Sequence, residues 1–213
     1  MARNRFFSLW IALVLVIVYL MQVFIFGFTE MFYLTSEALS MPWQFLTAIF
    51  LHGGLAHLVY NLFALILFGL ILESLIGSKK FLIMYLLAGI FANLISFMFY
   101  PSSLGASGAI MAIIGCLAAL RPMMTVWAFS LPMPMFVLAI IWVVGSVMGV
   151  FGLGDPTTGH IAHLSGIVVG LLYGLYLRFK KKKQESNSSG VLFKRKIDLP
   201  EGYMRAWENY HLK

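Results

Sequence analysis

Long apolar runs alternate with short polar breaks along this chain, and the length of the runs indicates the fold class. A helix needs about 20 mainly apolar residues to cross a hydrocarbon core of about 30 Å. The pattern therefore predicts an all-α, polytopic membrane protein with a bundle of six transmembrane helices. The six runs are residues 6–28, 55–76, 81–100, 107–120, 133–153 and 159–179.

The breaks between the runs contain the residues that end helices. Glycine, proline and small polar residues gather at GSKK (77–80), YPSSLG (100–105) and GLGDPTTG (152–159), and three prolines fall within 121–134. Such clusters are typical of turns and loops. The run at 107–120 is short for a span, so we expect this helix to be buried among the others.

The first loop, residues 29–54, is long but not very polar. It contains Trp43, Phe45 and Phe50, and aromatic side chains favour the interface between membrane and water. We expect this loop to lie half-sunk in the outer leaflet of the bilayer.

Composition agrees with a membrane protein. Of the 213 residues, 61% are hydrophobic and 11% are charged, whereas about 25% of the residues in a soluble domain are charged. The apolar run that follows the N-terminus is too long for a signal peptide, and no small-residue cleavage site follows it. We therefore expect this run to be retained as the first span.

Basic residues indicate the orientation of the chain, because lysine and arginine gather in cytoplasmic loops. With six spans, all 15 Lys and Arg residues fall on one side of the membrane. The loops on the other side, 28–54, 100–106 and 153–158, contain none. We predict that both termini are cytosolic. The net charge of +7 is then a positive-inside signal, and we expect no nucleic-acid partner.

We divide the chain into a membrane domain, residues 1–179, and a cytosolic region, residues 180–213. The latter begins with KKKKQESNSSG, which is typical of a polybasic anchor followed by a flexible linker. For residues 190–213 we favour disorder or loose surface association over a specific partner site. The chain is short and shows no targeting presequence, so we expect a multi-pass protein of a prokaryotic cell (inner) membrane.

A few polar side chains interrupt the apolar runs, and each is a functional candidate because polar groups are costly inside a membrane. His57 and Asn61 lie four residues apart, so they share one face of the second helix. Ser107 begins the fourth helix, and His163 lies about one turn into the sixth. These three helices all run inward in the predicted topology. The four side chains should therefore lie at similar depth, in the outer half of the bilayer.

These side chains are of the types that acyl transfer requires. Serine becomes a good nucleophile when a base, usually a neutral histidine, takes its proton. The oxyanion that forms needs preorganised donors, which a histidine N–H, an asparagine amide and the backbone N–H of Ser107 can supply. A helix N-terminus also favours negative charge. The nearest acid, Asp155, is in the outer loop, so the pattern predicts a Ser–His dyad rather than a triad.

Two rows of small residues would allow Ser107 and His163 to meet. Small residues at four-residue spacing let two helix backbones approach closely. Ser107 and His163 lie just N-terminal to the two rows, so packing of the rows would bring these side chains together. The rows are Gly108, Ala112 and Cys116 in the fourth helix, and Gly166, Gly170 and Gly174 in the sixth.

Other interpretations of the same residues stay open. A serine between small residues also fits helix packing, and the His–Asn pair fits interhelical hydrogen bonding. Four histidines, His52, His57, His160 and His163, form a candidate zinc set, but no HExxH motif, carboxylate or cysteine pair accompanies them. A channel or transporter usually shows broken helices, charged pore residues or paired halves, and none is visible. We expect no metal and no cofactor.

Three segments together resemble the rhomboid family of intramembrane serine proteases. FLHGGLAHLVYN (50–61) is similar to the family's His-x-x-x-Asn segment with its upstream His-Gly-Gly. GASG (105–108) resembles the Gly-x-Ser-Gly nucleophile motif, and AHLSGIVVG (162–170) resembles the Ala-His-x-x-Gly block. ESLIGSKKFL (73–82) is similar to the family's end of the second span. The matches occur in order between about residues 43 and 178.

The resemblance implies a role for each candidate residue. Ser107 would be the nucleophile, and His163 rather than His160 would be the general base, because it stands in the Ala-His-x-x-Gly frame. His57 and Asn61 would join the Ser107 backbone N–H in stabilising the oxyanion. The residues expected to pack near this site are Gly105, Gly108, Met111, Gly166 and Gly170.

The implied activity is hydrolysis of peptide bonds in or near the transmembrane segments of substrate proteins, with no cofactor. The expected partners are transmembrane protein substrates and the lipid bilayer. A helix hides its peptide bonds, so we expect a preference for substrates with helix-breaking or small residues near the cleavage point. The alternative is a non-catalytic rhomboid-like protein that binds transmembrane segments.

Two positions depart from the family pattern. Met111 stands where members often have an aromatic residue that packs on the histidine ring. The first loop has Pro42-Trp43-Gln44 where members often have a Trp-Arg pair. Inactive relatives typically lose the serine or the histidine, and this chain keeps both.

Overall fold

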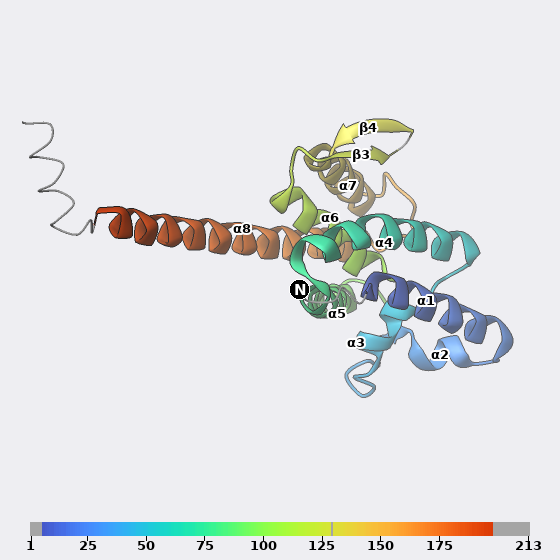
Figure 1. The fold of residues 1–213 in the computed structure, drawn as a ribbon. Coiled ribbons are helices and arrows are strands. Elements are labelled where there is room, and N and C mark those ends of the chain that lie inside the picture. Colours follow the sequence, from blue (N-terminus) through green and yellow to red (C-terminus); the bar gives the residue numbers. More distant parts are fainter. Residues whose placement is uncertain (1–5, 129, 198–213) are drawn as a thin grey trace, which may run out of the picture. The chain divides into compact units, whose positions relative to one another are not determined.

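The computed structural model describes residues 6–128 and 130–197 (Figure 1). Contacts divide the chain into two units, with the boundary inside the last helix, between Leu175 and Tyr176. The described helices are α1 (Phe7–Phe24), α2 (Phe28–Phe32), α3 (Gln44–Thr47), the 3-10 turn η1 (Ala48–Phe50), α4 (Leu55–Ile76), α5 (Ser78–Phe97), α6 (Ser107–Leu120), α7 (Met135–Val150) and α8 (His160–Ile197).

Among the described residues, four helices are long and apolar enough to cross a membrane. They are α1, α4, α5 and residues His160–Gln184 of α8. The protein is an integral membrane protein. The two remaining long apolar runs form the shorter helices α6 and α7, so the expected six full spans correspond here to four long helices and two short ones.

Glycines set the ends of several helices. Gly27 has φ +79° and separates α1 from α2, so α1 stops before the end of the predicted run. Gly77 has φ +86°, and its N–H donates to the carbonyl of Glu73 at the end of α4. A glycine with positive φ is the common helix terminator. Because α5 restarts directly after Gly77, it occupies 78–97 rather than the predicted 81–100.

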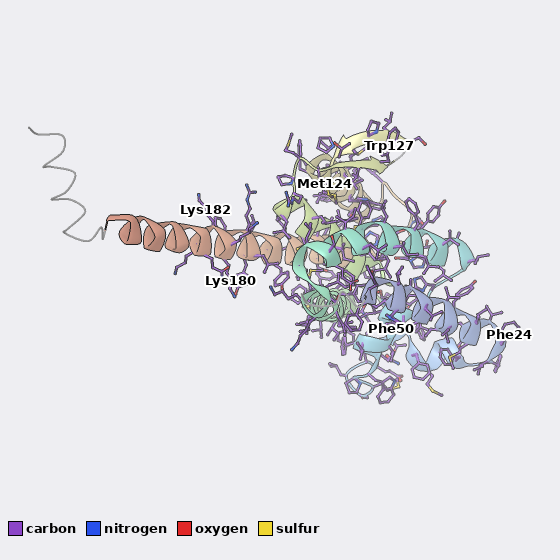
Figure 2. All side chains as sticks on the ribbon, in the orientation of Figure 1. Phe24, Phe50, Met124, Trp127, Lys180 and Lys182 are labelled. Carbon is purple, nitrogen blue, oxygen red and sulfur yellow. The ribbon has the colours of Figure 1, made fainter. Side chains whose placement is uncertain are left out.

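Short strands correct the all-α expectation. β3 (Thr125–Ala128) and β4 (Leu131–Pro134) form an antiparallel hairpin in which Trp127 pairs with Pro132. β1 (Leu34–Thr35) pairs with β2 (Ser102–Ser103). The TVWA segment is rich in β-formers, and its hairpin takes up the start of the run predicted as the fifth span. Trp127 is 69% exposed on β3 (Figure 2).

The helix α6 lies in the core, as the sequence predicted. Every residue from Gly108 to Ala119 is buried. Its neighbours in space are α4, α5 and α7, and rows of small side chains bring α8 against it. A helix surrounded by other helices does not need to span the hydrocarbon core by itself. Ser107 therefore stands at one end of the best-buried helix of the described chain.

The first loop is tied to the helices by side-chain amides. The Nδ2 of Asn93, on α5, donates to the carbonyl of Phe45 at 2.9 Å. The Oε1 of Gln44 accepts hydrogen bonds from the backbone N–H and the hydroxyl of Thr35, both at 3.0 Å. These bonds fix the part of the loop around Gln44 and Phe45. Its depth in the bilayer stays a prediction.

A buried carboxylate joins α1 to α4. Oε1 of Glu73 accepts the backbone N–H of Phe7 at 2.8 Å, and Oε2 accepts both the N–H and the hydroxyl of Ser8 at 2.9 Å. The first N–H groups of a helix have no partner inside it. Glu73 therefore caps α1 from the end of α4.

The last helix extends further than the sequence indicated. α8 continues through the lysine run to Ile197, where we expected a flexible linker. Lysine and glutamine are good helix formers, which favours this continuation. Within the second unit, the Lys180 ammonium lies 5.8 Å from the ring centroid of Tyr176. Figure 2 labels Lys180 on this part of α8. The prediction for residues 198–213 lies outside the described residues.

Candidate active site

Ser107 is the first residue of α6 and is half-buried. The N–H groups of a first helical turn have no partner inside the helix, so they can bind an anion. The preceding loop is anchored by Gly105, whose N–H donates to the carbonyl of Ala48 in η1 at 2.9 Å. The loop therefore presents the serine at a fixed helix start.

Gly105 lies close to both the ring of His57 and the hydroxyl of Ser107. A Cβ added at Gly105 would lie 2.8 Å from Cε1 and 3.1 Å from Nε2 of His57, and 3.9 Å from Oγ of Ser107. Gly105 also has φ +129°, a conformation that favours glycine. The geometry thus requires glycine here, and it places the His57 ring and the Ser107 hydroxyl close to the same residue.

The hydrogen bonds of His57 indicate its tautomer. The backbone N–H of Gly53 donates to Nδ1 of His57 at 3.4 Å. In a neutral imidazole, an accepting Nδ1 leaves the proton on Nε2. Nε2 is the nitrogen nearer to Gly105, so the protonated nitrogen of His57 is the one close to the loop that precedes Ser107.

Asn61 is buried one turn further along α4. Its Nδ2 donates to the carbonyl of His57 at 2.8 Å. An amide carries two N–H groups, so this bond takes up one of them. Asn61 therefore supports the turn that contains His57, with one N–H left.

His163 lies in α8 and is 7% exposed. The ring of Trp142, from α7, is 6.2 Å away between centroids at an interplanar angle of 86°. The ring of His160 is 6.4 Å away at 84°. Over the described part of the chain, no hydrogen bond joins the His163 ring to Ser107. In ligand-free structures catalytic hydrogen bonds are often long and tighten in the substrate complex.

The two rows of small residues face each other. A Cβ added at Gly166 would collide with the carbonyl oxygen of Gly108, and one added at Gly170 with that of Ala112. At Gly174 the nearest backbone atom would be the carbonyl oxygen of Cys116, at 2.7 Å. Glycines in α8 therefore allow direct backbone contact with α6.

The same packing brings the neighbours of Ser107 and His163 together. A Cβ added at Gly108 would lie 3.6 Å from the carbonyl oxygen of Ala162. Ser107 precedes Gly108, and His163 follows Ala162. Tyr100 ties the start of α8 to the segment before α6, because its hydroxyl accepts the N–H of Ile161 at 3.2 Å.

The outer-loop acid does not reach His163 directly. The carboxylate of Asp155 accepts hydrogen bonds from the N–H and the hydroxyl of Thr157, at 2.9 and 2.7 Å, and these bonds lower the pKa of Asp155. The backbone carbonyl of Asp155 is 3.0 Å from Nε2 of His160. The His160 ring also occupies the space where a Cβ on Gly149 would lie.

His52 is a second histidine beside His57, at 5.1 Å between ring centroids. Gln22 of α1 holds its backbone with two hydrogen bonds, at 2.9 and 3.1 Å. Both ring nitrogens of His52 are buried and have no partner within the described residues. Burial, and secondarily the nearby His57, lower the pKa of His52 to about 4.

Sequence reasoning missed Trp142, Tyr100 and Gln22. The signals for them were weak: Trp142 is one aromatic residue in an apolar run, and Gln22 is one polar residue in the first. Met111, which we expected near the site, is buried in α6, and a Cβ added at Gly166 would lie 3.3 Å from its Cβ. Across the described ranges, no group of three or more His, Cys, Asp or Glu side chains has a metal-binding arrangement.

The segment that contains all these residues matches a known family. The model of the rhomboid domain matches residues 39–180, which is more than half of the chain. The chain belongs to the rhomboid family. The matched range contains Ser107, His163, His57 and Asn61, so the geometry above is that of a rhomboid domain.

Several rhomboid relatives align with this chain. RHOMBOID-like protein 6, mitochondrial, of Arabidopsis thaliana is 31% identical over 137 residues, which cover 63% of this chain and 43% of that protein. Rhomboid protease GluP of Bacillus subtilis is 51% identical over 80 residues, covering 37% and 15%. Rhomboid protease GlpG of Haemophilus influenzae is 28% identical over 141 residues, covering 65% and 71%. The match spans less than half the length of the first two.

Proposed function

We propose that this rhomboid-family chain is an intramembrane serine endopeptidase with Ser107 as nucleophile and His163 as general base. One observation carries the proposal: α6 and α8 touch through Gly108 and Ala162, the sequence neighbours of Ser107 and His163. Family membership supports it, since relatives such as GlpG and GluP are named rhomboid proteases.

The chemistry follows from these positions. His163 takes the proton of the Ser107 hydroxyl while Oγ attacks the carbonyl carbon of the scissile peptide bond. The protonated His163 then gives that proton to the departing amine, and the acyl group stays on Ser107. A water molecule attacks the ester, and His163 takes a proton from the water. Returning this proton to Oγ releases the acid product and restores the serine.

The oxyanion of each tetrahedral intermediate needs preorganised hydrogen-bond donors. The backbone N–H of Ser107 and the Nε2–H of His57 are our two candidates, because Nε2 of His57 and the Ser107 hydroxyl both lie close to Gly105. Asn61 supplies its second amide N–H or holds His57 in place. Loss of one such donor typically costs about 2.7–4 kcal/mol of transition-state stabilisation.

The substrate proposal follows from the site's place in the membrane. The helices α6 and α7, with 14 and 16 residues, span about 21 and 24 Å at 1.5 Å per residue. We propose that they complete a six-helix bundle whose site opens to the side away from the basic residues, with both termini cytosolic. Water must reach Ser107, and the substrate's transmembrane helix must unwind locally to expose a peptide bond.

A cleavage assay on a model transmembrane substrate tests this function. The purified protein should cleave it, while Ser107→Ala and His163→Ala should reduce the rate at least about 10³-fold. Ser102→Ala, an exposed serine in β2, is the matched control and should cleave normally. If Ser107→Ala cleaves as fast as the wild type, the protease proposal is wrong. If substrate binds but none is ever cleaved, the non-catalytic alternative gains.

A further inference from the structure

A histidine that acts as a base must present one particular nitrogen to the serine. In a triad, a carboxylate bonded to the other nitrogen fixes the ring. Here the carboxylate of Asp155 bonds Thr157 instead. Among the residues that the structure describes, the ring of His163 has aromatic neighbours and no hydrogen-bonded partner. Some other contact must therefore limit the rotation of this ring.

Two rings stand perpendicular to that of His163. Trp142 approaches it from α7 at 6.2 Å and 86°, and His160 approaches it from one turn earlier in α8 at 6.4 Å and 84°. Aromatic pairs favour edge-to-face contact at centroid distances of about 4.5–7 Å. Both distances and both angles fall in this range.

His160 is itself fixed, so it can serve as a support. Its Nε2 is 3.0 Å from the carbonyl oxygen of Asp155. Its ring lies against two glycines: it fills the Cβ position of Gly149, and a Cβ at Gly154 would lie 3.2 Å from Nε2. Trp142 is half-buried and packs against the main apolar core. Each ring is thus held by contacts that do not involve His163.

We propose that Trp142 and His160 are positioning residues that clamp the ring of His163 between two perpendicular rings and so take the part of the absent carboxylate. The expected effect of these two rings on kcat rests on the proposed protease function. The clamp itself concerns the orientation of one ring, which can be measured without any activity.

The kinetic test compares removal of each ring with its conservative replacement. Trp142→Leu and His160→Leu should each lower kcat about tenfold or more, with KM within about twofold, because a misplaced base slows the chemical step rather than binding. Trp142→Phe and His160→Phe keep a ring and should restore most of kcat. Trp127→Leu, on the exposed face of β3, is the matched tryptophan control and should leave kcat unchanged.

The second test is spectroscopic and does not need an active protein. Histidine labelled with ¹³C and ¹⁵N gives ring signals, and the His163 signal is assigned by its loss in His163→Gln. In the wild type this signal should be shifted by the neighbouring indole, and Trp142→Leu should remove the shift and broaden the signal. Trp127→Leu should leave it in place.

The outcomes separate the clamp from the protease. If the wild type cleaves substrate while both leucine variants keep its kcat, the clamp is overturned and the protease stands. If the wild type is inactive but Trp142→Leu moves and broadens the His163 signal, the clamp is supported and the protease fails. If Trp142→Leu leaves that signal unchanged, the clamp is overturned whatever the activity. A leucine variant that does not fold is replaced in this comparison by the methionine variant at the same position, which has a similar bulk and no ring.

Discussion

The two histidines near Ser107 are held in different ways. His57 is half-buried, accepts a backbone hydrogen bond from Gly53 and fits against Gly105. His163 is buried and is held by rings and by the close packing of α6 on α8. The orientation of His57 thus depends on a hydrogen bond and a glycine in the neighbouring loops. The orientation of His163 depends on side-chain packing. Substitutions should therefore affect the two histidines through different measurable quantities.

The largest effect should come from the packing of α8 on α6. Gly170→Leu places a side chain on the carbonyl of Ala112, which forces the helices apart and moves His163 away from Ser107. We expect loss of activity and a marked fall in Tm, since overpacking costs about 1–3 kcal/mol or more.

Gly145→Ala is the matched control for this substitution. A Cβ at Gly145, on α7, would meet nothing within 4 Å, so activity should persist and stability should stay level or rise slightly. Equal Tm values for wild type and Gly170→Leu would contradict the close packing of α6 and α8.

The next effect should come from the loop that precedes Ser107. Gly105→Ala introduces a Cβ 2.8 Å from Cε1 of His57 at a φ that disfavours alanine. The displaced His57 can no longer donate beside Ser107, so kcat should fall about 10²–10³-fold. Steady-state kinetics should show this change together with a fall in Tm, because the positive φ strains alanine. Gly53→Ala, whose Cβ would have its nearest neighbours at 3.8 Å, should keep most of kcat, and a comparable fall there would count against the His57 assignment.

A smaller effect is expected at Asn61. Its amide bonds the carbonyl of His57 inside α4, so Asn61→Ala should act mainly by loosening His57. We expect kcat to fall about tenfold, less than for Gly105→Ala, as one supporting hydrogen bond contributes about 0.5–1.5 kcal/mol. A loss as large as that of His57→Ala would instead make Asn61 a direct oxyanion donor.

The smallest effect concerns pH and His52. Burial lowers the pKa of His52 from 6.5 to about 4, so the unfolded chain binds more protons between these values. Above pH 6.5 the imidazole is neutral in both states and does not lower the free energy of unfolding. As the pH falls from 6.5 toward 4, protonation of His52 in the unfolded chain lowers that free energy. Between pH 7 and pH 5.5 the loss should be about 1 kcal/mol.

His52→Phe should reduce that pH dependence, because phenylalanine does not titrate and the ring nitrogens of His52 have no partner within the described residues. His57 is the titratable group beside His52, and it is unchanged in this variant. The free energy of unfolding in detergent, followed against pH for both proteins, measures the difference. Parallel curves for the two proteins would contradict the lowered pKa of His52.

The contact between α6 and α8 was easier to predict from sequence than the contacts around the two histidines. Rows of small residues every four positions fix which faces of α6 and α8 can touch, so the spacing of Gly108 and Gly166 within their rows was enough to indicate that contact. The apolar runs likewise predicted α4 and α6 to the residue. These features depend on periodicity within one helix, which a single sequence contains.

The contacts that hold the histidines depend on tertiary placement instead. Trp142 reaches His163 only because α7 packs on α6, and Gln22 reaches His52 only because α1 lies near the first loop. The hairpin β3–β4 was missed because its apolar residues merge with the next span, and the extension of α8 because lysine suits both a linker and a helix. In each case the local sequence was compatible with two different secondary structures. Tertiary packing or continuation of the helix decided which of them formed.

The most direct test of the Ser107–His163 dyad is labelling with a serine-reactive fluorophosphonate probe, read by mass spectrometry of the modified peptide. We expect that Ser107 is modified in the folded protein, that His163→Ala lowers the rate of labelling at least about 10²-fold, and that Ser102→Ala leaves it unchanged. Labelling that misses Ser107, or that proceeds equally fast in His163→Ala, would contradict the Ser107–His163 dyad.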